Sequence, residues 1–154
     1  MKWLLLVVLM IAISANYVIA NMHDPVAEKV WNEVVKDAAY KKWKNWPDHA
    51  GMQCGLSSPH GELHIVYVND VGLSKRGTPK PYGTVVVKED YTQDRKLDAI
   101  TVMYKVPGYN PDAADWFWAR YTADGKAGPV GTPEGCISCH MERSGRDFII
   151  VSQY

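Results

Sequence analysis

Three residues near the C-terminus have the types and the spacing that covalent haem attachment requires. Residues 136–140 read Cys-Ile-Ser-Cys-His, the C-x-x-C-H signature of c-type haem. Two thiols separated by two residues fit on one helical turn, where they can add across the two vinyl groups of a haem. The adjacent histidine supplies an imidazole, a good ligand for iron. The motif predicts one haem c, attached through Cys136 and Cys139, with His140 as the proximal iron ligand.

Two other uses of a C-x-x-C pair fit this sequence less well. A thioredoxin-like redox pair lies in a βαβ unit, near the start of a helix, whereas this pair follows a run rich in Gly and Pro, residues 125–135. A structural zinc site needs four ligands, and the sequence contains no second pair with zinc-like spacing. Haem attachment also explains the histidine that follows directly.

The first twenty residues have the pattern of a secretory leader. Lys2 precedes an apolar stretch, residues 3–13, and small residues follow up to Ala20. So short a stretch with no basic cluster after it favours a cleaved signal peptide over a spanning helix, with an uncleaved N-terminal anchor as the alternative. We therefore expect a signal peptide at residues 1–20, a single haem domain at residues 21–154, and a periplasmic protein with no membrane segment after cleavage.

The overall charge argues against one class of partner. The chain has 154 residues, with 17 Lys and Arg against 17 Asp and Glu. Balanced charge gives no electrostatic reason to bind nucleic acid or an anionic membrane surface. The length is that of one domain with one core. The third cysteine, Cys54, is either buried and inert or a link between two subunits.

The rest of the chain must form the scaffold that positions the haem. Asp24 and Pro25 are typical of an N-cap and a first helical position, and apolar residues then recur at helical spacing, which predicts one amphipathic helix over about residues 25–44. After it the apolar period changes to two, with turn residues in the gaps. Strands are expected at residues 63–68, 83–89, 99–105, 116–122 and 148–151.

Short strands without helices between them favour antiparallel pairing. The predicted fold class is therefore α+β, mainly β: an antiparallel sheet with one N-terminal amphipathic helix and a C-terminal segment that carries the C-x-x-C-H motif. This differs from the all-helical small cytochromes c. Trp116 and Trp118 share one strand face and are expected in the core or in a dimer interface.

Several short motifs follow one another in order along the chain. They are Trp43 and Trp46, Pro59-His60-Gly61, residues 66–69, 82–89, 103–105, 108–111 and 115–118, and the late C-x-x-C-H. This ordered set, over about residues 28–151, resembles the cytochrome P-460 family, which also contains the beta-sheet cytochromes c′. The resemblance implies a small antiparallel β fold, a homodimer and a five-coordinate, His-ligated c-type haem. It also implies either oxidation of hydroxylamine or binding of nitric oxide and related gases.

The resemblance singles out one lysine. Hydroxylamine-oxidising members carry a Lys in the strand G-T-V-x-V-K-E that is bonded covalently to the haem, and the matching residue is Lys88. On a strand, Thr84 and Val86 share a face with Lys88. The lysine either extends to solvent, as most lysines do, or points at the haem, where desolvation would favour the neutral, nucleophilic amine.

Two departures from the family pattern concern the distal side. The hydroxylamine oxidisers use a Glu as proton acceptor, but the matching stretch, residues 99–105, contains no carboxylate, and Thr101 stands near the expected place. Thr cannot accept a proton at neutral pH, so turnover is expected to be slow. His64 stands in place of a distal Arg. It is either a hydrogen-bond donor or base for a bound ligand or a strand histidine that faces solvent.

Three other residues have smaller expected roles. We expect His60 to bond the backbone of its turn, with a place at the edge of the distal pocket as the alternative. We expect Met52 and Met103 in the core rather than on the iron, since Met is mostly core filler.

Two function classes remain open. If the protein is an enzyme, it is a hydroxylamine oxidoreductase that forms products at the level of NO or N2O, which Lys88 favours. Otherwise it is a non-catalytic gas-binding or electron-transfer cytochrome, which the missing carboxylate favours. Both classes imply a small nitrogenous ligand, hydroxylamine or NO, and a periplasmic redox partner.

Overall fold

The computed structural model describes residues 24–55 and 59–151. The predicted signal peptide, residues 1–20, lies outside these ranges. Within them, the helices are all too short or too polar to cross a membrane.

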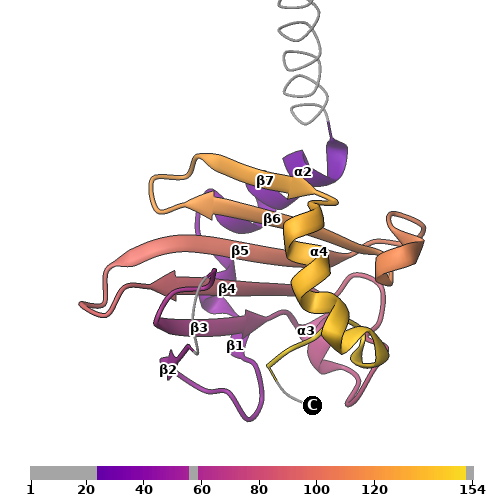
Figure 1. The fold of residues 1–154 in the computed structure, drawn as a ribbon, viewed down its shortest axis with the longest axis horizontal. Coiled ribbons are helices and arrows are strands. Elements are labelled where there is room, and N and C mark those ends of the chain that lie inside the picture. The colour runs from indigo at the N-terminus through magenta and orange to yellow at the C-terminus, as the bar shows by residue number, and fades with distance from the viewer. Residues whose placement is uncertain (1–23, 56–58, 152–154) are drawn as a thin grey trace, which may run out of the picture.

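One antiparallel sheet forms the body of the molecule (Figure 1). Seven strands make up the sheet in the described part of the chain, in the order β1-β3-β4-β5-β6-β7, with β2 also paired to β3. This confirms the predicted α+β, mainly β fold. The strands are β1 (Lys44–Asn45), β2 (Gln53–Cys54), β3 (Leu63–Val68), β4 (Val85–Tyr91), β5 (Leu97–Lys105), β6 (Trp116–Thr122) and β7 (Ala127–Gly131).

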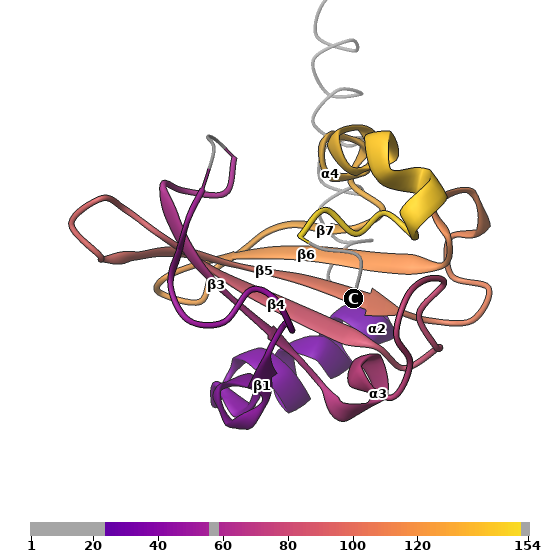
Figure 2. The same ribbon diagram turned by 90° about the horizontal axis from the view of Figure 1, so that it is seen from below.

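Short helical segments cover the two faces of the sheet. Figure 2 shows the N-terminal segments on one face and the yellow C-terminal helix α4 on the other. The segments are α2 (Pro25–Val30), η1 (Trp31–Val35), η2 (Ala39–Lys42), α3 (Asp70–Leu73), η3 (Pro111–Ala113), α4 (Glu134–His140) and η4 (Met141–Arg146).

The single helix predicted over residues 25–44 is wrong in its continuity. It begins as expected, because Asp24 Oδ1 accepts from the amide of Val26 at 2.8 Å and Pro25 follows as the first helical residue. The α-helix becomes a π-helical turn at Trp31. It then ends at Ala38, whose φ of 49° is left-handed, and a left-handed residue cannot continue a right-handed helix.

The strand predictions hold where the apolar pattern alternates. Those for residues 63–68 and 116–122 match β3 and β6 at both ends, whereas β4 begins at 85 and β5 at 97. The strand predicted at 148–151 is wrong. The amides of Phe148 and Ile149 bond the carbonyls of Arg143 and Arg146 in η4, so this segment closes a helical end instead. β7 lies in the run rich in Gly and Pro, residues 125–135, where no strand was predicted.

Two hydrophobic clusters lie on the two faces of the sheet, and successive residues of β4 alternate between them. Val85 and Val87 pack under the N-terminal segments, while Val86 belongs to the cluster under α4. Trp116 and Trp118 are buried in the second cluster, which fits the predicted core position. One face of β4 therefore packs against the N-terminal segments, and the other face lies under α4.

Candidate functional site

Helix α4 carries the C-x-x-C-H motif across the sheet (Figure 1). Cys136 and Cys139 are three positions apart on it, so both side chains lie on one side of the helix. Both thiols are free, with Cys139 exposed and Cys136 partly buried. Burial raises the pKa of the Cys136 thiol. The pair can react with one planar group that lies alongside the helix.

His140, the last residue of α4, is held by one hydrogen bond. Its Nδ1 lies 2.7 Å from the carbonyl oxygen of Phe148, and a carbonyl only accepts, so Nδ1 is the donor. Nε2 is then the nitrogen with a free lone pair, as a metal-binding imidazole requires. Burial lowers the pKa of His140, partly offset by the bond to Phe148. The rings of Trp118 and His60 contact it at 4.7 and 6.0 Å between centroids.

Next to the cluster under α4, the same face of the sheet becomes polar. Strand register pairs His64 with Asp90 and Lys88 with Thr101, and Thr101 in turn pairs with Arg120. Paired residues of adjacent strands point to the same face. That face is the one that holds Trp118, because Trp118 and Arg120 are two residues apart on β6. We call His64, Lys88, Asp90, Thr101 and Arg120 the polar face.

Lys88 is largely buried, so it does not extend into solvent as most lysines do. Its side chain is 19% exposed, and Nζ lies 3.4 Å from Asp90 Oδ1. Across the sheet, the Thr101 hydroxyl donates to the Lys88 carbonyl at 3.5 Å. Burial lowers the pKa of Lys88, and the charge of Asp90 offsets part of that shift. The neutral amine is thus easier to form here than at a surface lysine.

His64 is also buried, contrary to the alternative of a solvent-facing strand histidine. It is 6% exposed. Its Nε2 lies 2.6 Å from Nε2 of His49, with the two rings stacked. Burial lowers the pKa of His64 to about 4, helped by the charge of Lys88. At neutral pH His64 is therefore uncharged, and its Nδ1 has no hydrogen-bond partner among the described residues.

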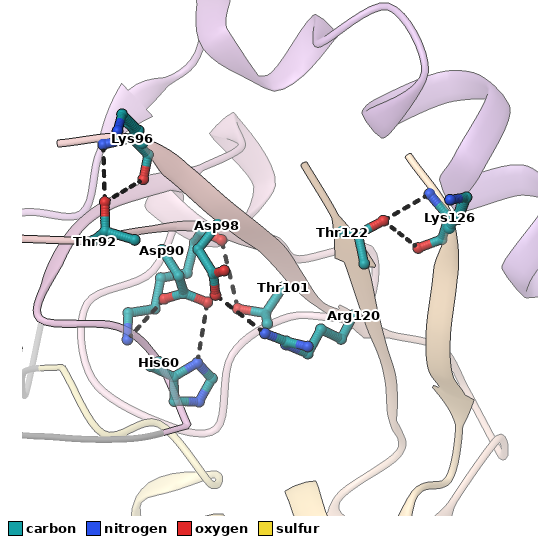
Figure 3. A network of polar contacts seen from close by, with 10 residues as sticks. His60, Asp90, Thr92, Lys96, Asp98, Thr101, Arg120, Thr122 and Lys126 are labelled. Atoms are coloured by element: carbon teal, nitrogen blue, oxygen red, sulfur yellow. Dashed lines mark hydrogen bonds and ion pairs between the residues drawn. The ribbon is translucent and has the colours of Figure 1, made fainter. Parts of the chain in front are cut away.

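Residues 99–105 contain no carboxylate, but a carboxylate lies on the neighbouring strand of the same face. Asp90, on the neighbouring strand β4, is fully buried. Its Oδ2 lies 3.4 Å from His60 Nδ1, and Figure 3 shows the contact. Asp90 follows Lys88 by two residues, so the strand period alone places both on one face. The sequence contained this signal, whereas His49 comes from a loop that no motif marks.

The remaining candidates are distributed as follows. His60 contacts His140 and Asp90, so its place is at the edge of the site and not only in its turn. Met103 packs in the cluster under α4, as expected. Met52 is 37% exposed, so the expectation of a core position is wrong. Cys54 is free and exposed.

The residues on this side of the sheet fit a haem. Two free thiols and a histidine with an available Nε2 supply the attachment points. Buried polar atoms without partners are rare in proteins, yet His64 Nδ1, Trp118 Nε1 and Arg120 Nε have none among the described residues. Trp118 Nε1 and Arg120 Nε are donors, and such unsatisfied donors suit a ligand with acceptor atoms; haem has two propionate carboxylates.

Comparison with known proteins agrees with this assignment. The family model described as Cytochrome P460 matches residues 37–151. The match covers most of the chain, from η2 through α4 and η4. No curated protein matches the chain.

Proposed function

We propose a function from one premise: the chain belongs to the cytochrome P460 family and carries a c-type haem. Cys136 and Cys139 form the two thioether bonds, and His140 Nε2 ligates the iron. The support for this ligand is the bond from His140 Nδ1 to the Phe148 carbonyl, which leaves Nε2 available.

Within that family, we propose that the protein oxidises hydroxylamine to products at the level of NO or N2O. The observation that carries this proposal is the buried pair of Lys88 and Asp90 on the polar face. A bound haem iron supplies the ligand site and accepts electrons. Removing electrons from NH2OH also releases protons, so a base must lie close. Asp90 is that base, in place of the glutamate that residues 99–105 lack.

Three side chains have separate roles in this proposal. Asp90 Oδ1, 3.4 Å from Lys88 Nζ, would take the proton that the ammonium must lose before its nitrogen can react. The bond from Lys88 to the haem edge would replace one C–H and one N–H by C–N, a two-electron oxidation that needs an added oxidant of the peroxide class. His64, neutral at physiological pH, offers Nδ1 to the bound substrate as a hydrogen-bond partner. Thr101, paired with Lys88 in the register, adds a hydroxyl but no base.

One observation favours a second candidate, a gas-binding or electron-transfer cytochrome without turnover. The contact between Lys88 and Asp90 is an ion pair when Lys88 is protonated. An ammonium is not a nucleophile, so a persistent pair prevents the bond to haem. The same ammonium can donate a hydrogen bond to bound NO.

Intact mass and visible spectra of the holoprotein separate the two candidates. A Lys88–haem bond lowers the mass below the sum of chain and attached haem by the hydrogens lost, and it shifts the ferrous Soret band far to the red. Lys88→Leu should restore an ordinary c-type spectrum and abolish hydroxylamine turnover. The matched control is Lys96→Leu, at a side chain that is 79% exposed. Equal spectra and turnover in wild type and Lys88→Leu would leave the gas-binding function.

We also propose a periplasmic homodimer that passes electrons to a periplasmic redox partner. The leader-like residues 1–20 and the attachment of c-type haem outside the cytoplasm support the location. The family resemblance supports the dimer. Cell fractionation and light scattering of the purified holoprotein measure the two properties.

A further inference from the structure

A buried ion pair lies next to the segment that holds His140. Lys105, at the end of β5, and Asp147, directly after η4, are each 5% exposed, and Lys105 Nζ donates to Asp147 Oδ1. The other oxygen, Oδ2, accepts from the backbone amide of Lys80 at 2.7 Å. Lys105 Nζ also lies over the ring of Trp116, 5.1 Å from its centroid. Both carboxylate oxygens therefore have partners outside the C-terminal segment.

The backbone at this ion pair is strained. Asp147 and Phe148 have φ values of 58° and 63°, and consecutive left-handed residues without glycine are uncommon. Such strain persists only where the surroundings enforce it. Here the enforcing contacts come from both ends of Asp147: its carboxylate binds Lys105, and its carbonyl accepts from Trp116 Nε1 at 2.9 Å.

The next carbonyl along the chain is the one that His140 uses. Phe148 O accepts from His140 Nδ1 at 2.7 Å, one peptide unit beyond the anchored Asp147. We propose that Asp147 is a positioning residue for the axial ligand. Lys105 and the Lys80 amide hold Asp147, Asp147 holds the Phe148 carbonyl, and that carbonyl fixes the tautomer and the ring plane of His140. The inference rests on the proposed role of His140 as the iron ligand.

The ion pair of Lys105 and Asp147 is better explained by the backbone geometry that it imposes than by a gain in stability. A buried ion pair is seldom more stabilising than apolar side chains of the same volume, so net stability alone does not explain it. A hydrogen bond from the distant nitrogen of a metal-bound imidazole makes the imidazole a stronger donor. A carbonyl held rigidly at 2.7 Å keeps that effect constant.

The test uses the holoprotein and reads the iron–histidine bond directly. In Asp147→Asn, we expect resonance Raman of the ferrous protein to show the iron–histidine stretch at lower frequency and broadened. We expect a higher reduction potential, since a weaker donor favours the ferrous state. The matched control is Asp94→Asn, which breaks the exposed pair of Asp94 with Lys96 and should change neither quantity. An unchanged stretch and potential in Asp147→Asn would overturn the proposal, even if that variant unfolds more easily.

A second variant covers the case in which Asp147→Asn leaves Lys105 buried without its counter-charge and does not fold. The double change Lys105→Met with Asp147→Leu removes both charges together, which buried ion pairs tolerate well. It should shift the stretch and the potential in the same directions, and wild-type values would refute the positioning role. A wild-type protein with no iron–histidine band, or a band that persists in His140→Gly, would instead refute the ligand assignment.

Discussion

Lys88 and Asp90 reach the polar face because the residue between them, Glu89, is held on the other side of β4. Successive strand residues point to opposite faces, and the Glu89 side chain is fully buried under the N-terminal segments. Glu89→Gln tests this anchor, because it removes the charge and keeps the size and one acceptor oxygen. We expect the change to lower the free energy of unfolding.

The expected magnitude follows from the hydrogen bonds that Glu89 accepts. Tyr40 and Tyr91 donate at 2.8 Å and Tyr67 at 3.2 Å. A hydrogen bond to a charged group contributes about 1 kcal/mol more than a neutral one, so three bonds give about 3 kcal/mol. The carboxylate also loses more hydration on burial than an amide does, which reduces the expected loss to roughly 2 kcal/mol. Lys41, whose side chain is 52% exposed, adds little because solvent screens it.

The contribution of Glu89 to the free energy of unfolding depends on pH, and its direction follows from the pKa of Glu89. Burial alone would raise the pKa of Glu89, but hydrogen bonds from Tyr40, Tyr91 and Lys41 bring it below its usual value. A carboxyl whose pKa falls on folding stabilises above its unfolded pKa and loses that effect as pH falls through the folded pKa. The difference in free energy of unfolding between wild type and Glu89→Gln should therefore become smaller in acid.

Urea denaturation at neutral pH and in acid measures both quantities. The control is Glu33→Gln at an exposed position, which should stay within about 0.5 kcal/mol of wild type. If Glu89→Gln changed the free energy of unfolding at neutral pH as little as the control does, the proposed stabilising role of Glu89 would be refuted. A difference that does not narrow in acid would refute the electrostatic reason given for it.

Three further changes test other parts of the molecule. Gly61 has a φ of +69°, and a Cβ there would lie 2.8 Å from the Tyr91 carbonyl; Gly61→Ala should therefore lower the free energy of unfolding by about 1–3 kcal/mol, and an unchanged urea midpoint would contradict this. Asp90→Asn should reduce hydroxylamine turnover by about 100-fold or more at equal haem content, and a wild-type rate would reject Asp90 as the base. Folding raises the pKa of Tyr67 from 10.0 to about 12, mainly through burial and then Glu89; the associated stability is complete below the lower value and lost as pH rises to the upper one. Unfolding curves between these two pH values should show wild type losing stability relative to Tyr67→Phe. A difference in free energy of unfolding that stays constant with pH would contradict the raised pKa of Tyr67.

The four strands β3, β4, β5 and β6 could be predicted because apolar runs there are bounded by turn residues. β3 ends at Asn69, whose side chain caps α3, and β6 ends where Asp124 and Gly125 turn the chain. The N-terminal helix could not be predicted in full, because apolar spacing continues past Ala38 while the backbone there is left-handed. The apolar residues 148–151 fit a strand by composition, but the segment is bonded to η4 instead.

Some residues of the candidate site could be predicted from the sequence and others could not. The C-x-x-C-H motif is local, so it identifies Cys136, Cys139 and His140 without any fold. Lys88 and Asp90 are related by the strand period, and one pattern predicts both. The stacking of His49 on His64 depends on how a loop returns to β3, and no spacing along the chain encodes that return.

The two proposed functions differ by the position of one proton on the polar face. With the proton on Lys88, the ammonium and Asp90 form an ion pair 3.4 Å apart, and the site can hold NO by a hydrogen bond. With Lys88 deprotonated, the amine is a nucleophile, as a bond to haem requires. Burial lowers the pKa of Lys88, and the charge of Asp90 offsets part of that shift, so Lys88 loses its proton more readily than a surface lysine does. In the first proposed function, Asp90 would have to pass on the proton that it took from Lys88 before it could serve as the base in turnover.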